Sequence, residues 1–205
     1  MPGSRYEPLT TPIFRDEASE PEVFAGSRLI PNFGLPQPPE VLREPFRRSI
    51  IDHRLETEEG LALAKLVGWS PDRLWGTFQT YQSDYSARAA LQRTNDVTIR
   101  RVMVAMRFSV IDDPDTLDSH RLLDGVIAPI DDDLWEDVLP PLAWGCRCRV
   151  HLVSETRLQR TEADPRYQRV GQYLLIRGMG YRDLRSAVRR LEKYTNCEPS
   201  RKRCG

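Results

Sequence analysis

The distribution of proline constrains the fold of this chain more than any other feature of its sequence. Nine of its sixteen prolines fall within the first 48 of 205 residues. Because proline fixes φ and removes a backbone N–H donor, a stretch this rich in proline is expected to sustain neither helix nor central strand. We therefore expect residues 1–40 to form an extended arm that lies on its own domain or on a neighbouring subunit.

The segment from residue 41 to residue 96 is predicted to be helical. Its clearest start signal is Ser70-Pro71-Asp72, because serine suits the N-cap, proline the first turn and aspartate the positive end of the helix dipole. Apolar and aromatic residues then recur at steps of three to four: Leu74, Trp75, Phe78, Tyr81 and Tyr85. Few basic residues interrupt this stripe, so it indicates core or interface rather than a platform for stacking bases.

From residue 97 the sequence becomes β-branched and apolar, which predicts a strand, or a short helix leading into a strand, over residues 97–111. A further strand is expected at residues 146–153. Strand alternation there would place the side chains of Cys146 and Cys148 on one face and that of His151 on the other. Together with the helices before them, these strands favour an α+β fold whose small β-containing domain spans residues 97–156.

Charge is distributed unevenly, although the formal net charge is zero. Residues 157–205 carry thirteen Arg and Lys against five Asp and Glu, a net charge of +8, so the remainder of the chain carries −8. Most of this acidic excess lies between residues 110 and 140. A uniformly basic coat for nucleic acid is therefore excluded, and the basic character is confined to a C-terminal tail at residues 157–205.

One helix is predicted with an apolar stripe in that tail, at residues 181–194. The stripe could pack on the domain core and leave a solvated basic face, or that basic face could contact DNA phosphates or an acidic protein surface. The candidate contact residues of the tail are Arg182, Arg185, Arg189, Arg190, Lys193, Arg201, Lys202 and Arg203.

A histidine, a Cys-x-Cys pair and several carboxylates between residues 113 and 151 supply the ligand types that Zn²⁺ prefers. Two cysteines two residues apart on a strand point to the same side, so Cys146 and Cys148 could share one ion with His120. The fourth ligand is not obvious; the candidates are Asp118, Asp113, Asp124 and His151, the last disfavoured by strand alternation. Packing without metal and a disulfide bond remain alternatives.

No catalytic residue is identified in the sequence. A nucleophilic cysteine needs a nearby base, and none is evident. Asp131-Asp132-Asp133 together with His120 leaves a small metal-dependent nuclease or hydrolase as an alternative function, although a solvated acidic turn explains the same residues. Cys197 and Cys204 bracket six residues and could form a disulfide, remain free thiols or join a second metal site.

Neither a membrane-spanning segment nor a secretion signal is expected. The chain has no run of about 18 apolar residues, and its first residues lack a basic segment followed by an apolar one. Its four cysteines are too few and too clustered for a disulfide scaffold, so a reducing compartment is the expected setting.

An ordered set of short motifs runs through residues 97–153. They are His120, Asp124-Gly125, Asp131-Asp132-Asp133 with Trp135, Pro140-Pro141, Trp144-Gly145 and Cys146-Arg147-Cys148-Arg149-Val150. In this order and spacing they resemble the C-terminal domain of the phage Mu F-like minor head protein family. That family usually has arginine two residues before its Ser-His pair, where this chain has Leu117, so the salt link of that arginine would be lost or supplied by Arg121 or Arg107.

This resemblance implies a structural, non-enzymatic component of a tailed-bacteriophage virion, assembled in the host cytoplasm. Such a minor head or connector protein would act in head morphogenesis by docking to portal or major capsid subunits within a symmetric multi-subunit assembly. A structural zinc could close its motif domain. The alternatives are the hydrolase above and a packaging accessory that binds DNA through the basic tail.

Overall fold

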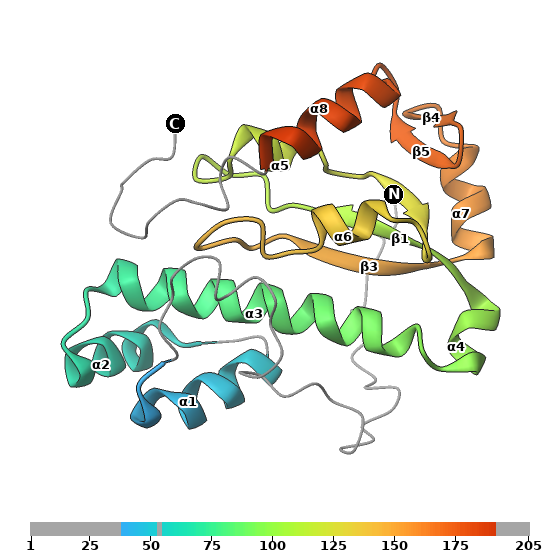
Figure 1. The fold of residues 1–205 in the computed structure, drawn as a ribbon. Helices are drawn as coiled ribbons and strands as arrows, with labels where there is room; N and C mark the ends of the chain where they lie inside the picture. Colours follow the sequence, from blue (N-terminus) through green and yellow to red (C-terminus); the bar gives the residue numbers. More distant parts are fainter. Residues whose placement is uncertain (1–37, 53–54, 192–205) are drawn as a thin grey trace, which may run out of the picture.

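The computed structural model describes residues 38–52 and 55–191, so nearly all of the predicted arm lies outside the described residues. The fold is mixed α+β, as predicted. Helices α1 (Glu40–Ile51), α2 (Thr57–Val67) and α3 (Pro71–Arg93) form one side of the molecule. A five-stranded sheet with most of the remaining helices forms the other side (Figure 1).

Helix α1 lies almost entirely in the segment from residue 41 that was predicted to be helical, but it contains Pro45. The expectation that the proline-rich first 48 residues sustain no helix is therefore wrong for their last part. Leu42, Phe46 and Ile50 are spaced four residues apart and are fully buried. Burial of each large apolar side chain contributes roughly 1.5–3 kcal/mol. Three of them therefore offset the roughly 3 kcal/mol cost of a proline inside a helix.

Helix α3 is buried on two opposite faces. It starts as predicted, with the Arg73 N–H donating to Ser70 Oγ at 3.2 Å. The aromatic stripe packs in a core shared with α1 and α2, where the Phe78 ring lies edge-on to Phe46 at 5.6 Å. The opposite side of α3 packs against strand β3 (Arg149–Ser154). It consists of small buried residues, namely Gly76, Thr80, Ser83, Ala87 and Ala90.

The sheet is antiparallel throughout, in the order β3-β1-β2-β5-β4. Its other strands are β1 (Met103–Ser109), β2 (Ile127–Pro129), β4 (Tyr167–Val170) and β5 (Tyr173–Ile176). Helix α4 (Val97–Val102) leads directly into β1, which confirms the second of the two predictions for this segment. The strand expected at residues 146–153 begins only at Arg149, so both cysteines precede it.

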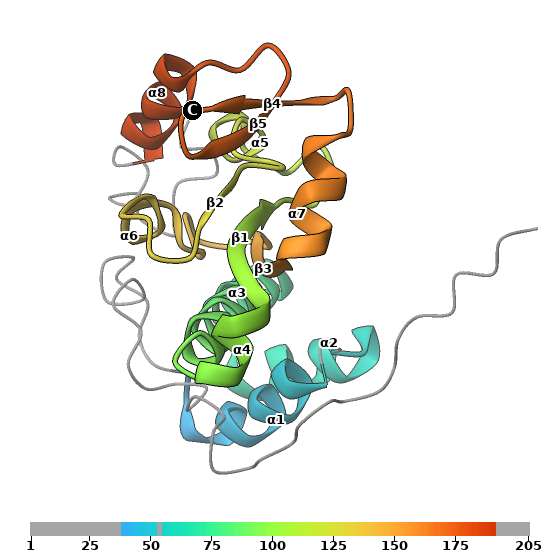
Figure 2. The same cartoon turned by 90° about the vertical axis from the view of Figure 1, so that its right-hand side faces the viewer.

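The two faces of the sheet bury different clusters. Met106 and Phe108 of β1 pack toward α3, α6 (Leu134–Val138) and α8 (Tyr181–Leu191), whereas Ala105 of β1 packs toward Leu158 of α7 (Glu155–Glu162). Figure 2 shows α6 and α7 on opposite sides of β1. The segment expected as a basic tail thus adds two strands and α8 to the sheet and its core, as far as the structure describes it.

Helix α8 has the apolar stripe that the sequence predicts. Four of its residues are buried in the main core, namely Leu184, Ala187, Val188 and Leu191. The end of the predicted helix, residues 192–194, lies outside the described residues. The helix also contacts the short helix α5 (Asp118–Arg121). None of the described helices is both long and apolar enough to cross a membrane.

Candidate metal centre

Three predicted metal ligands converge in the structure. His120 comes from α5, and Cys146 and Cys148 come from the segment before β3. One ligand atom of each lies within 4.8 Å of the other two, and all three residues are buried. His120 Nδ1 lies 3.5 Å from Cys148 Sγ.

The spacing of these atoms fits a zinc ion. A thiolate sulfur at about 2.3 Å and an imidazole nitrogen at about 2.0–2.1 Å from a tetrahedral Zn²⁺ stand about 3.6 Å apart, close to the observed 3.5 Å between Cys148 Sγ and His120 Nδ1. A small pocket is lined by all three residues together with Thr116 and Trp144.

Helix α3 holds the cysteine segment in place. The Gly145 N–H donates to Thr80 Oγ1 at 2.8 Å, and Ser83 Oγ donates to the Cys148 carbonyl at 2.7 Å. The Ser83 hydroxyl also lies 3.9 Å from Cys146 Sγ. Gly145 has φ of +76°, a conformation that favours glycine and turns the chain into the Cys-x-Cys segment.

The surroundings shift the pKa values of the two thiols in opposite directions. Burial would raise the pKa of Cys146, but its hydrogen bonds with Cys148 and His120 outweigh burial and lower that pKa well below its usual value. The pKa of Cys148 is raised by its hydrogen bond to Cys146 and by burial. Loss of a proton is therefore favoured at Cys146 over Cys148. One anionic sulfur beside an imidazole is a suitable starting point for metal binding.

Ion pairs brace the loop that carries α5. Arg121 pairs with Asp112 and with Asp118, each at 2.9 Å. Arg147, between the two cysteines, donates to Asp113 at 2.6 Å and holds the pKa of that carboxyl down at about 2. Arg121 thus makes salt links beside the Ser-His pair.

The structure does not bring the predicted fourth ligand to the cluster. The Asp118 side chain is 93% exposed and is engaged by Arg121. Asp113 binds Arg147, and Asp124 accepts the Val110 N–H at 3.0 Å. His151 is exposed on β3. Among the described residues the cluster therefore has three ligands.

The aspartates considered for hydrolysis point to different partners. Asp131 pairs with Arg100, and Asp132 accepts the Leu134 N–H at 2.8 Å and contacts Tyr173. These carboxylates lie outside the three-ligand cluster of the described residues. The arrangement offers them no shared metal position there, which a metal-dependent hydrolase would need.

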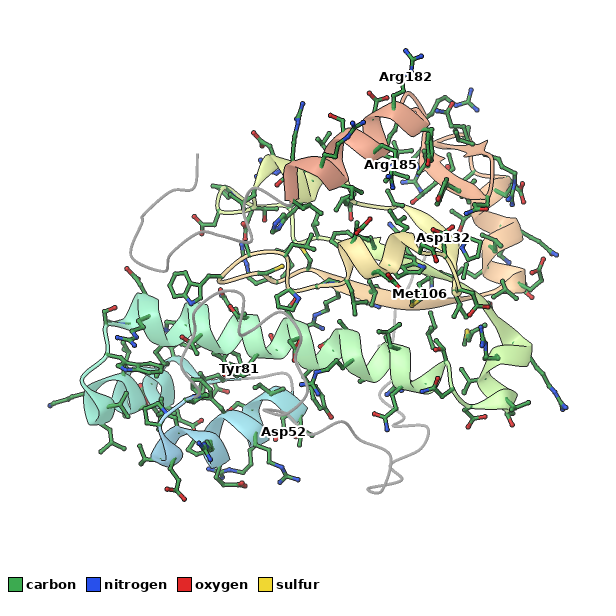
Figure 3. The ribbon with its side chains drawn as sticks, in the orientation of Figure 1. Asp52, Tyr81, Met106, Asp132, Arg182 and Arg185 are labelled. Atoms are coloured by element: carbon green, nitrogen blue, oxygen red, sulfur yellow. The ribbon has the colours of Figure 1, made fainter. Side chains whose placement is uncertain are left out.

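The basic contact residues divide between described and undescribed parts. Four arginines of α8 are exposed, and no ion pair with another described residue involves them: Arg182, Arg185, Arg189 and Arg190. Figure 3 shows Arg182 pointing away from the body of the molecule. The other predicted contacts and the C-terminal cysteines lie outside the described residues: Lys193, Arg201, Lys202, Arg203, Cys197 and Cys204.

Sequence reasoning missed the residues of α3 that position the cysteines. Thr80 and Ser83 donate or accept the hydrogen bonds above, and Gly76 lies directly beneath the Trp144 ring. A signal for them exists, because small residues recur every three to four positions opposite the aromatic stripe. Such spacing indicates a second, closely packed face.

Comparison with known proteins identifies a family that matches the part of the chain containing the His120, Cys146 and Cys148 cluster. A family model for phage Mu protein F like proteins matches residues 48–151, about half of the chain. Among curated proteins, the Mu-like prophage FluMu F protein of Haemophilus influenzae is 43% identical over 53 residues, which are 26% of this chain and only 13% of that protein. No solved structure shows a significant match.

Proposed function

The chain belongs to the phage Mu protein F-like family, and from this membership we propose that it is a structural component of a tailed-bacteriophage particle acting in head morphogenesis. In this role it docks to portal or major capsid subunits as a minor head or connector protein and remains in the virion after assembly in the host cytoplasm. The family match over residues 48–151 carries the proposal. The proline-rich arm of residues 1–40 is a candidate for contacts with neighbouring subunits.

Deleting the coding sequence from the phage genome tests this role directly. We expect particle yield to collapse or heads to be defective, with recovery when the chain is supplied in trans. Cross-linking of intact particles should then join this chain to portal or capsid subunits. Normal yields of infectious particles without the chain would refute the role.

A structural zinc bound by His120, Cys146 and Cys148 belongs to the same proposal. When bound, the ion would cross-link α5 to the segment before β3. The 3.5 Å separation of His120 Nδ1 and Cys148 Sγ supports it. Ser83 would hold Cys148 through its carbonyl, and Arg147 would fix the intervening turn on Asp113. These contacts orient the ligands and suit a site that maintains structure.

Metal content and stability together test the zinc site. The purified wild-type chain is expected to hold about one equivalent of zinc, and Cys146→Ser or His120→Ala should lose it and unfold at a lower temperature. His151→Ala removes a histidine that the structure places outside the three-residue cluster, exposed on β3, and should keep the metal. Less than about half an equivalent in the wild type, with stability unchanged in Cys146→Ser, would leave packing or a disulfide as the role of the cysteines.

The exposed arginines of α8 support a second function, contact with DNA phosphates. Four of them have no acidic partner among the described residues, and guanidinium groups bind phosphate through paired hydrogen bonds. A titration of duplex DNA at two salt concentrations tests it. We expect the affinity to fall with salt and to fall further in Arg182→Glu with Arg189→Glu; an affinity independent of salt would exclude phosphate contacts.

A further inference from the structure

On the face of the sheet that packs against α7, three arginines have no carboxylate partner among the described residues, unlike other arginines of the domain. Arg100, Arg121 and Arg147 each pair with an aspartate of the acidic stretch. In contrast, no described residue forms an ion pair or a hydrogen bond with the guanidinium group of any of three others, namely Arg107, Arg149 and Arg157. Arg107 Nε is even buried without a partner.

Strand register brings these arginines together around His151. Arg107 of β1 lies directly opposite His151 of β3, and Arg149 precedes His151 by two residues, on the same face. Arg157 follows in the first turn of α7, which begins where β3 ends. The pKa of His151 is lowered by desolvation of its ring and by the positive charges of Arg149, Arg107 and Arg157. These four residues are termed the basic sheet patch.

Such a patch is unfavourable within one molecule. Like charges on adjacent strands repel one another, and no described carboxylate neutralises these three. The exposed side chains of His151 and Arg157 leave the patch accessible. A counter-charge supplied from outside the chain would therefore be favourable.

A matching group of acids lies on α6. Asp133, Glu136 and Asp137 are exposed, and no ion pair with a described residue engages them. Their neighbours Asp131 and Asp132 are already occupied by Arg100 and by the residues around Tyr173. Asp133, Glu136 and Asp137 are termed the acidic α6 patch.

The two patches lie on opposite sides of the sheet. Helix α6 buries Leu134 and Trp135 in the core shared with α3, whereas α7, which carries Arg157, packs Leu158 on the other face. Figure 2 shows these two helices on either side of β1. One molecule therefore cannot bring its own patches together, but the basic sheet patch of one copy can face the acidic α6 patch of the next.

We propose that this chain associates with itself head to tail, the basic sheet patch of one copy docking on the acidic α6 patch of its neighbour. Three formal positive charges then meet three negative ones. The basic patch is compact, centred on one histidine, so it suits a small carboxylate cluster better than the long row of phosphates along a duplex. Such a heterologous contact extends into a ring or a filament.

Sedimentation of charge-reversed variants tests this contact. The wild type should self-associate at about 50 mM salt and dissociate at about 500 mM. Arg149→Glu with Arg157→Glu reverses the basic patch, and Glu136→Lys with Asp137→Lys reverses the acidic one. Each double variant alone should self-associate at least about tenfold more weakly. An equimolar mixture of the two should associate again with 1:1 composition, because the intact acidic patch of one variant meets the intact basic patch of the other.

The control variant, Arg182→Glu with Arg185→Glu, makes the same change in net charge on α8 and should associate like the wild type. Circular dichroism checks that every variant is folded, and the salt dependence of the wild type needs no variant. A monomeric wild type at low salt, a mixture that does not associate, or loss of association in the control would each overturn the proposal. The proposal would also fail if the wild type is monomeric and Arg149→Glu with Arg157→Glu weakens its binding to duplex DNA, because the basic sheet patch would then bind phosphates. None of these outcomes depends on the head role.

Discussion

Replacing Gly76 by alanine tests the close packing that positions the Cys-x-Cys segment on α3. A Cβ atom at Gly76 would lie 2.3 Å from Trp144 Cζ2, 2.5 Å from Cη2 and 2.7 Å from Cε2. Favourable carbon contacts lie at about 3.5–4.0 Å. The ring would have to move by more than about 1 Å, yet the neighbouring Gly145 N–H is fixed on Thr80 and the Cys148 carbonyl on Ser83.

Two opposing terms set the size of the effect. Alanine is favoured over glycine within a helix by about 1 kcal/mol. Overpacking a well-filled site costs about 1–3 kcal/mol, and contact with three ring atoms at once places Gly76 at the upper end of that range. We therefore expect Gly76→Ala to lower the free energy of unfolding by about 2 kcal/mol.

Urea denaturation followed by circular dichroism measures this change. With a slope of about 2 kcal/mol per molar urea, the midpoint should fall by about 1 M. In a Trp144→Leu background the clash is absent, so Gly76→Ala should instead stabilise the chain by up to about 1 kcal/mol. The coupling between the two sites is then about 3 kcal/mol. A Gly76→Ala chain more stable than the wild type would refute the packing that we describe.

Three further substitutions probe buried polar groups. Ser83→Ala should lower the free energy of unfolding by about 1–3 kcal/mol in thermal or urea denaturation, because it leaves the Cys148 carbonyl without its donor. Ser119→Ala is the matched control. The buried Ser119 Oγ has no partner among the described residues, so its removal should change the free energy of unfolding by less than about 0.5 kcal/mol. Burial and the nearby Asp84 charge raise the pKa of Tyr81 to about 12, so stability should be lost as the pH rises from about 10 to about 12. Tyr81→Phe should flatten that loss in denaturation curves at alkaline pH, and an unchanged slope would contradict it.

The sequence predicted most reliably those elements whose local pattern and burial agree. The stripe of Leu184, Ala187, Val188 and Leu191 is continuous over a helix and is buried as expected. The candidate metal-binding cluster could be predicted for a similar reason, because the side chains of His120, Cys146 and Cys148 are chemically distinctive. Cys146, Cys148 and Val150 also share a buried side, as alternation predicted, although the strand itself starts later.

Features that depend on tertiary contact were missed. Strands β4 and β5 have four residues each and gain their stability from pairing with one another and with β2, which the short pattern of residues 167–176 does not reveal. Pro45 by itself disfavours helix, but burial of its neighbours in α1 outweighs this local preference. Asp118 was a reasonable ligand from spacing alone, yet Arg121 on the same short helix engages it first.

Net charge summed along the chain was a poor guide to where the charged surfaces of the folded protein lie. The acidic stretch between residues 110 and 140 suggested one negative surface, but Asp112, Asp113 and Asp131 are engaged by arginines of the same domain. What remains unpaired among its described acids is largely the acidic α6 patch. Pairing partners, rather than totals, therefore decide where a surface is charged. Two arginines of one motif differ for this reason: Arg147 binds Asp113, whereas Arg149, two residues later, has no ion-pair partner among the described residues.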